Sequence, residues 1–390
     1  MLRPWIICCL LVVLTACAHS QGSAESQAAL EAGTFPEPIA DFEQHRLDVY
    51  DYLRVSSLPN RSDADIRLNL PFELSANSDT PYRGKFLLFH GLSDSTYVWT
   101  DFAQALATRG FDVRSLLLPG HGSHPREMLD ISYTEWLVAA RKHYALWNTD
   151  ATPFYVGGFS LGGVIATILA LEQPDSIDGL FLISPAYHSK LNSLLRWSWL
   201  YAWYKPWMFG GLILEDNPVK YNSIPINSGT QYYRATQYLK RKWDNKKLAM
   251  PVLMVATIDD SVVDVAYTRR LFQTRFSSPV KQLLIYSNDE SITAGANEII
   301  HSSAYQQRRI LNQSHLSLVN SPANPLFGKD GTVLVCNGNE YPVFMACMNS
   351  PNHWYGAQHT PSPDGTPMAR TTYNPDFDSV LKLFGEVFLR

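Results

Sequence analysis

The sequence has few cysteines and no strong excess of charge of either sign. Five cysteines occur among 390 residues, and 32 basic against 36 acidic side chains give a formal net charge of -4. A nucleic-acid-binding protein usually carries a basic stripe, whereas the short groups at 240–242 and 246–247 are typical of a solvated helix face. The sequence also contains neither a His-Glu-x-x-His motif nor a glycine-rich phosphate loop. We therefore expect no nucleic-acid partner, no metal and no organic cofactor.

Long apolar runs are scarce as well, and the run at the N-terminus is too short to span a bilayer comfortably. It follows Arg3, covers residues 5–14 and ends in Leu14-Thr-Ala-Cys17. This pattern is typical of a secretory signal peptide. Its end resembles the lipobox of bacterial lipoproteins, which implies a signal peptide over 1–16 and a lipid on Cys17. An ordinary signal peptide, cleaved after a nearby alanine, is the alternative.

The predicted lipid would hold the protein on a membrane of the cell envelope without a spanning helix. Ala18 stands where lipoproteins retained in the inner membrane carry Asp, so we expect the outer membrane, on its periplasmic face. A secreted or periplasmic protein is the alternative. Cys336 and Cys347 remain after the N-terminal cysteines are set aside. In an oxidising compartment we expect a disulfide between them, with two buried thiols as the alternative.

The body of the chain alternates between apolar strands and amphipathic helices, which predicts an α/β fold with a mainly parallel sheet flanked by helices. In the preceding part, residues 41–60 favour a helix and residues 65–74 alternate like a strand. The predicted organisation is a tether over 17–40, an N-terminal extension over 41–80, a core over 81–185 and 250–390, and an insertion over 186–249.

The insertion at 186–249 is rich in aromatic residues and is predicted to form a cap. It contains five tryptophans and seven tyrosines. Such a cap suits an apolar acyl chain. The alternative interpretation is that these rings pack the cap onto the body of the protein.

The candidate nucleophile is Ser160 in Gly158-Phe159-Ser160-Leu161-Gly162. The motif follows an apolar strand at 154–157 and opens a helix at 161–171. Hydrolases that use this motif need a sharp strand-to-helix turn that lifts the serine above the sheet, with glycines where the chain approaches itself. The alternative is a glycine-rich turn with a solvated serine.

A serine nucleophile needs a histidine base and an acid that orients the histidine, and in this kind of fold the acid precedes the base in the chain. The adjacent Asp259 and Asp260 follow an apolar strand directly, whereas Asp264 suits the N-cap of the next helix. His315 follows the short apolar segment 309–311, which we interpret as the end of a strand. The other late histidines are His301, expected in or before a helix, and His353 and His359, which lie in a polar stretch.

These motifs in this order resemble the monoglyceride-lipase-like and serine-aminopeptidase-like α/β hydrolases over roughly 84–319. The resemblance implies a triad of Ser160, Asp260 and His315. Thr257 stands where the family usually has glycine, which leaves Asp259 as a rival for the acid.

The resemblance extends to the oxyanion hole, which requires preorganised backbone donors. One donor is the N–H of Leu161, after the nucleophile. The resemblance implies Leu92 as the second, in the loop His90-Gly91-Leu92, where His90 braces the loop. His121 of Pro119-Gly120-His121-Gly122 is interpreted as a loop-structural residue.

The predicted activity is hydrolysis of carboxylic esters through an acyl-enzyme on Ser160. The expected substrates are a mono-acyl lipid, a lysophospholipid or a medium-chain ester. A serine aminopeptidase is the first alternative, and Glu215 and Asp216 in the cap are the candidates for holding its substrate's ammonium group. A non-catalytic lipoprotein that binds a ligand is the second.

Overall fold

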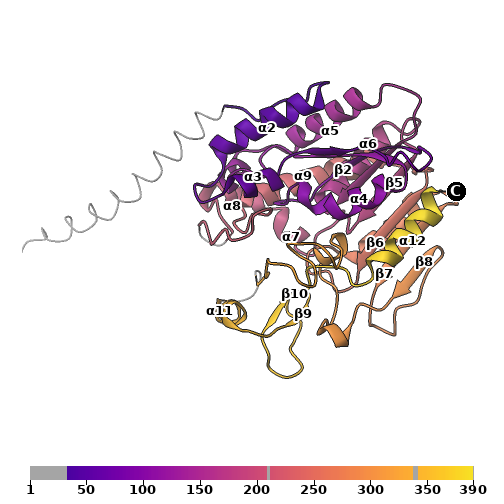
Figure 1. Ribbon diagram of the computed structural model, residues 1–390. Coiled ribbons are helices and arrows are strands. Elements are labelled where there is room, and N and C mark those ends of the chain that lie inside the picture. Colours follow the sequence, from indigo (N-terminus) through magenta and orange to yellow (C-terminus); the bar gives the residue numbers. More distant parts are fainter. Residues whose placement is uncertain (1–32, 209–210, 337–340, 390) are drawn as a thin grey trace, which may run out of the picture.

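The computed structural model describes residues 33–208, 211–336 and 341–389 (Figure 1). The predicted signal peptide, Cys17 and most of the predicted tether lie outside the described residues, so they stay predictions. Within the described ranges, no helix combines the length and the apolar character needed to cross a bilayer.

The centre of the fold is an eight-stranded sheet in the order β1-β3-β2-β4-β5-β6-β7-β8. Only β1 is antiparallel to its neighbour, so the predicted mainly parallel α/β sheet is confirmed. Both faces are buried, which is why the central strands are continuous apolar runs. The strands are β1 Phe72–Leu74, β2 Gly84–Phe89, β3 Phe111–Leu116, β4 Phe154–Phe159, β5 Gly179–Ile183, β6 Val252–Thr257, β7 Lys281–Tyr286 and β8 Glu298–His301.

Helices cover both faces of this sheet. Side chains of α4 and α12 form one apolar core with one face of the strands, and side chains of α5, α6, α9 and α10 form another with the opposite face. Along β2, Phe86 and Leu88 belong to the first core and Leu87 and Phe89 to the second, as strand geometry requires. The helices are α2 Phe42–Ser56, α3 Asp63–Leu68, α4 Thr100–Ala107, α5 Tyr133–Trp147, α6 Leu161–Glu172, α7 Asn192–Leu195, α8 Ser198–Tyr204, α9 Ile226–Lys242, α10 Val265–Arg275, α11 Tyr341–Asn349 and α12 Phe377–Phe388.

The strand predicted over 65–74 is wrong for most of its length. Residues 63–68 form α3, and only residues 72–74 pair with the sheet as β1. The local reason is a capping box, in which the Ser62 hydroxyl accepts from the Asp65 N–H while the Asp65 carboxylate accepts from the Ser62 N–H. The alternation of apolar and polar residues over 65–74 does not reveal this capping box, which begins a helix instead of a strand.

The inserted helical region between β5 and β6 carries α7, α8 and α9. Its tryptophans do not share one environment: Trp243 is buried against Tyr187 and Phe276, whereas Trp197, Trp199 and Trp203 are exposed. The interpretation that the aromatic residues pack the cap onto the body therefore fails for these three side chains.

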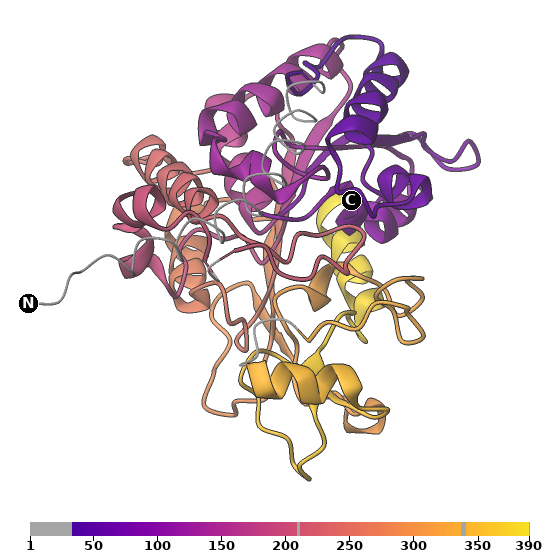
Figure 2. The same ribbon diagram turned by 90° about the vertical axis from the view of Figure 1, so that its left-hand side faces the viewer.

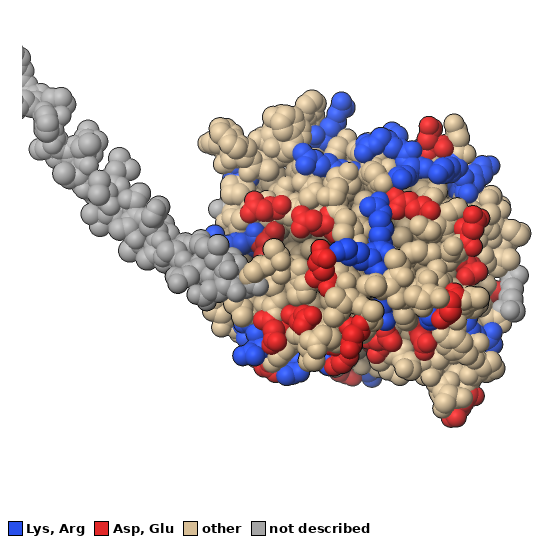
Figure 3. Space-filling model, turned by 90° about the horizontal axis from the view of Figure 1, so that it is seen from above, with Lys and Arg blue, Asp and Glu red and all other residues tan. Residues whose placement is uncertain are grey.

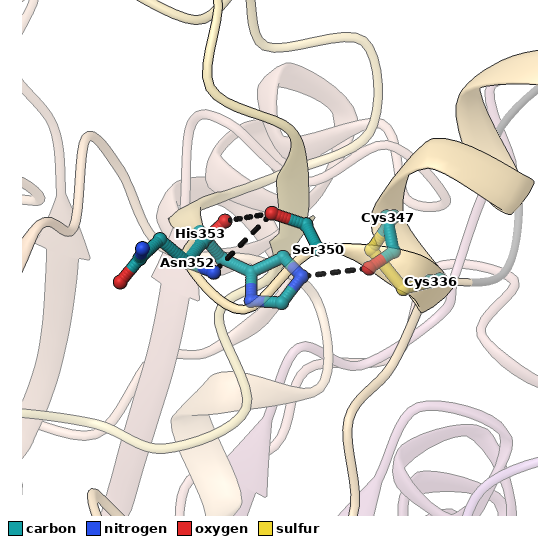
Figure 4. Close-up of a disulfide and its surroundings, with 5 residues drawn as sticks. All are labelled: Cys336, Cys347, Ser350, Asn352 and His353. Carbon is teal, nitrogen blue, oxygen red and sulfur yellow. Dashed lines mark hydrogen bonds between the residues drawn. A yellow bond between two sulfur atoms is a disulfide. The ribbon is translucent and has the colours of Figure 1, made fainter.

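A small unit at residues 321–375 follows the sheet strands and precedes α12. It contains α11 and a parallel pair of short strands, β9 Trp354–Gly356 and β10 Met368–Arg370. Figures 1 and 2 show this orange and yellow unit at the opposite end of the molecule from α2. Cys336 and Cys347 are joined there by a disulfide, and His353 Nε2 donates to the Cys347 carbonyl at 2.7 Å (Figure 4). We call residues 321–375 the disulfide unit.

The N-terminal extension is attached to the sheet through Arg114 of β3. Its guanidinium lies over the rings of Phe42 in α2 and Trp147 in α5, 4.3 and 4.4 Å from their centres. It also bonds the Glu73 carboxylate, Nε to Oε2 at 2.7 Å.

We expect Arg114→Ala to lower the free energy of unfolding by about 2 kcal/mol, because it removes both ring contacts and leaves Glu73 without its cation. Urea unfolding of the variant and the parent measures the loss. Glu73→Gln is the control, because it keeps Arg114 between the rings and should cost less than half as much. An equal loss in the two variants would show that the rings contribute nothing.

Candidate active site

Ser160 lies at a sharp turn between β4 and α6. Its backbone has φ 54° and ψ -116°, a conformation that a serine rarely adopts. A Cβ on Gly158 would overlap the backbone of Gly162, and a Cβ on Gly162 would overlap the carbonyl of Phe89 at the end of β2. Both glycines are therefore required sterically, and they hold the first turn of α6 against the end of β2.

The three residues predicted as a triad lie in one hydrogen-bonded relay. His315 Nε2 is 3.0 Å from Ser160 Oγ, and His315 Nδ1 is 2.6 Å from Asp260 Oδ2. Since an ionised carboxylate only accepts, Nδ1–H donates to Asp260, and Nε2 is left to accept the serine hydroxyl proton. Asp260 is fully buried, and its other oxygen accepts from the N–H groups of Val262 and Val263 at 2.7 and 2.9 Å.

The rival acid Asp259 points elsewhere. Its carboxylate accepts from the Ser303 hydroxyl at 2.9 Å and from Asn312 Nδ2 at 3.4 Å, and burial raises its pKa. Asp264 caps α10 by accepting from the Tyr267 N–H, as its predicted N-cap position requires. Of the two adjacent aspartates, Asp260 is the one in contact with His315.

The other late histidines lie elsewhere, and two of them have partners of their own. The expectation that His301 lies in or before a helix is wrong: it ends β8, whose pairing with β7 is what draws this segment into the sheet, and its Nδ1 is 2.6 Å from Asp376 Oδ2. His353 binds the backbone of Cys347, and His359 is exposed in the disulfide unit.

The loop that carries His315 is held by the disulfide unit and not by a sheet strand. Residues 309–311, expected to end a strand, form only isolated bridges, so that expectation is wrong. The Leu311 N–H donates to the Tyr355 carbonyl, the Ser314 hydroxyl to the Thr371 carbonyl at 2.6 Å, and the Thr371 hydroxyl back to the Asn312 carbonyl at 2.7 Å. Nothing in the sequence indicated these contacts, because they join segments about 60 residues apart.

Two backbone N–H groups are available beside Ser160. Within the described residues, neither the Leu161 N–H nor the Leu92 N–H has a hydrogen-bond acceptor. Leu161 opens α6, and Leu92 follows the end of β2. The contact of Gly162 with Phe89 brings these two elements together, as a two-donor oxyanion hole requires.

His90 braces the Leu92 loop through both ring nitrogens. Nδ1–H donates to the Gly91 carbonyl at 2.8 Å, and Nε2 accepts from the Leu118 N–H at 3.0 Å. The second bond requires the neutral ring, because only an unprotonated Nε2 accepts, and complete burial lowers the pKa of His90 to about 4. His121 packs its ring against His90 and bonds the Pro119 carbonyl, and burial lowers its pKa to about 3.

The cap also holds this loop, through two contacts that the sequence did not predict. The Tyr221 N–H donates to the Ser93 carbonyl at 2.8 Å, and Lys220 Nζ lies 2.7 Å from the Asp94 carboxylate. No sequence motif marks Lys220 or Tyr221, so only the folded arrangement reveals them.

A small cavity lies beside the loop that the cap holds. Its volume is about 30 Å³, and Asp94, Phe159 and Lys220 are among the residues that line it. This volume admits a water molecule. Figure 3 shows one face of the molecule, on which basic and acidic side chains are both exposed. Within the described part of the chain, no three His, Cys, Asp or Glu side chains gather in a way that could hold a metal ion.

Residues 84–316 match the family described as alpha/beta hydrolase fold, which is more than half of the chain. The chain belongs to the α/β-hydrolase fold family. The matched range of this α/β hydrolase includes Ser160, Asp260 and His315, whereas the N-terminal extension and the disulfide unit lie outside it.

Among characterised relatives, the chain is distantly similar to a thermostable monoacylglycerol lipase of Bacillus sp. (strain H-257). The two are 26% identical over 206 residues, which are 52% of this chain and 80% of the lipase. It is also similar to a pimeloyl-[acyl-carrier protein] methyl ester esterase of Chromobacterium violaceum, at 36% identity over 99 residues. That match spans 25% of this chain and only 35% of the esterase.

Solved structures with a similar fold include two monoacylglycerol lipases. A soluble variant of the Saccharomyces cerevisiae enzyme, bound to a substrate analog, has 17% identity and a TM-score of 0.45, and the match covers 56% of this chain and 82% of that one. The Paleococcus ferrophilus enzyme has 20% identity and a TM-score of 0.45, with 56% and 88% covered. At these identities the likeness extends to the fold alone.

Burial of neutral His90 makes stability depend on pH. Since its pKa is about 4 in the folded chain and about 6.5 when unfolded, the unfolded state binds more protons between these values. The neutral His90 ring therefore contributes up to about 3 kcal/mol to the free energy of unfolding above pH 6.5. This contribution is lost as the pH falls toward 4. We expect His90→Gln to flatten the dependence of the unfolding free energy on pH in this window.

Urea unfolding across the pH range measures this dependence. His359→Gln is the control, because that exposed ring should leave the slope unchanged. A His90→Gln slope equal to that of the parent would contradict the assignment of a buried neutral ring.

Proposed function

We propose that this α/β hydrolase is a serine hydrolase that cleaves carboxylic esters through an acyl-enzyme on Ser160. The observation that carries the proposal is the relay from Ser160 Oγ through His315 to the buried Asp260 carboxylate. The N–H groups of Leu92 and Leu161, which have no acceptor among the described residues, support it, because acyl transfer needs donors for a developing oxyanion.

In the proposed reaction, His315 Nε2 takes the hydroxyl proton as Ser160 Oγ bonds to the ester carbonyl carbon. The carbonyl oxygen becomes an oxyanion that accepts from the Leu92 and Leu161 N–H groups. The carbon–oxygen bond to the alcohol then breaks, and the alcohol leaves with the proton from His315. Water then loses a proton to His315 and bonds to the acyl carbon. The bond from that carbon to Ser160 Oγ breaks, Oγ takes the proton back from His315, and the acid leaves. The Asp260 carboxylate accepts from His315 Nδ1–H and orients the imidazole throughout.

The substrate class that we propose is a mono-acyl lipid, a lysophospholipid or a medium-chain ester. The distant similarity to a monoacylglycerol lipase supports a small ester of a fatty acid. We also propose that Cys17 carries lipid and holds the enzyme at the outer membrane, facing the periplasm. The intact mass of the envelope-extracted protein, with an acylated Cys17 as its first residue, would test this anchor.

The peptidase alternative is less favoured by the geometry of the cap. The Glu215 carboxylate accepts from the N–H groups of Asn222 and Ser223, and Asp216 accepts from Asn222 Nδ2 at 2.7 Å. Both oxygens of Glu215 are therefore engaged within the cap, and the exposed Asp216 has one oxygen in such a bond. A purely ligand-binding role would not require the relay at Ser160.

We expect Ser160→Ala to abolish both labelling by a fluorophosphonate probe and hydrolysis of p-nitrophenyl esters. The probe bonds covalently to an activated serine, and the alanine variant lacks that oxygen. Ser291→Ala, at an exposed serine, should keep both activities. Persistent labelling of Ser160→Ala would overturn the assignment of the nucleophile.

Asp260→Asn should lower kcat by about 10⁴-fold, because an amide does not orient the imidazole in the required tautomer. The matched variant Asp259→Asn should keep kcat close to that of the parent, since this side chain bonds Ser303 instead. Steady-state kinetics on a soluble ester measures both. If Asp259→Asn lost as much kcat as Asp260→Asn, the acid would be assigned wrongly.

A further inference from the structure

The cap presents an unusually apolar surface. Twelve of the 21 exposed large apolar side chains in the described part of the chain fall between residues 191 and 214. Trp203 and Tyr204 at the end of α8 are 90% and 83% exposed. We call the exposed apolar side chains of 191–214 the cap face; six of them lie on or next to α8, namely Trp197, Trp199, Leu200, Tyr201, Trp203 and Tyr204.

In helix α8 the large apolar side chains are exposed and a small polar one is buried, the reverse of a helix that packs on a protein core. Its one buried side chain is Ser198, whose hydroxyl bonds Thr230 of α9 at 2.7 Å and the Leu195 carbonyl at 2.7 Å. The small polar residue thus faces the protein, and the large apolar rings face outward. A water-exposed helix normally has the opposite arrangement, and an exposed apolar surface of this size is typical of a site that contacts a partner or a membrane.

The segment that carries the cap face is basic. Between residues 188 and 214 the charged side chains are Lys190, Arg196 and Lys205, and the acidic Glu215 and Asp216 follow directly after it. Arg196 lies over the Trp197 ring, 5.3 Å from its centre. Tryptophan and tyrosine favour the boundary between headgroups and acyl chains, and cations near them are attracted to anionic lipids.

We propose that the cap face docks on an anionic phospholipid surface, with its rings in the headgroup region and without spanning the bilayer. A second copy of this chain fits less well, because a contact between two cap faces would bring two basic segments together. The proposal is independent of the predicted lipid on Cys17, because residues 191–214 supply both the apolar and the cationic contributions.

The segment that would dock on the membrane is connected to the candidate active site. The same insertion that carries the cap face also holds the Leu92 loop, through Tyr221 N–H to Ser93 and through Lys220 to Asp94. The enzyme would therefore take lipid-borne esters better than its activity on soluble esters indicates.

Vesicle sedimentation tests the proposal with the chain from residue 18 onward, which keeps every described residue and leaves out the predicted signal peptide and lipid. Phosphatidylcholine vesicles with and without phosphatidylglycerol are compared. The double variant Trp199→Ser with Trp203→Ser should bind phosphatidylglycerol vesicles at least about tenfold more weakly, since two large rings no longer leave water. Replacing Lys190, Arg196 and Lys205 by Gln should remove the preference for phosphatidylglycerol.

Tyr341→Ser with Val343→Ser is the matched control, because these exposed side chains lie on α11 and should leave vesicle binding unchanged. Thermal unfolding verifies that each variant is folded. Undiminished vesicle binding by the double tryptophan variant, or no binding by the parent, would overturn the proposal. A parent dimer in light scattering that dissociates in the tryptophan variant would overturn it too, because a second copy would then cover the face.

Hydrolysis of a water-soluble ester separates this proposal from the proposed function. The double tryptophan variant should keep the parent's kcat on that ester. If vesicle binding fails while Ser160-dependent hydrolysis persists, only the docking is wrong. If the soluble ester is never hydrolysed while vesicles are bound, only the esterase function is wrong.

Discussion

The close contact between the first turn of α6 and the end of β2 is the constraint on which the site depends. It exists because Gly162 has no side chain to separate the helix from the Phe89 carbonyl. The contact sets Ser160 at its unusual backbone angles and brings the Leu161 N–H toward the loop of Leu92. The buried sheet supplies the rigidity that keeps both elements in register.

The parts that surround this contact come from segments outside the ordinary alternation of strands and helices. The cap holds the Leu92 loop through Lys220 and Tyr221, and the disulfide unit holds the His315 loop through Tyr355 and Thr371. The two loops thus have separate supports on separate insertions. Asp260, in contrast, is fixed locally by two N–H groups of its own turn.

The sequence predicts best what local physical chemistry determines. Buried parallel strands are continuous apolar runs, and the glycines around Ser160 mark a turn that no other residue permits, so the sheet and Ser160 could be predicted. The prediction of His315 rests partly on a family resemblance and partly on a strand at 309–311, and the second ground is wrong because those residues form only isolated bridges. The placement of His301, the supports on the two loops and the outward rings of α8 depend on contacts between distant segments, which periodicity does not encode.

The loop that carries the base depends on a segment far from it along the chain. The nucleophile, the acid and the oxyanion loop all precede residue 300, but the carbonyl and the hydroxyl that hold the base loop belong to Thr371. Loss of the Thr371 contacts would leave the serine turn and the acid in place and would free only the base loop. The site can therefore lose its base separately from its nucleophile.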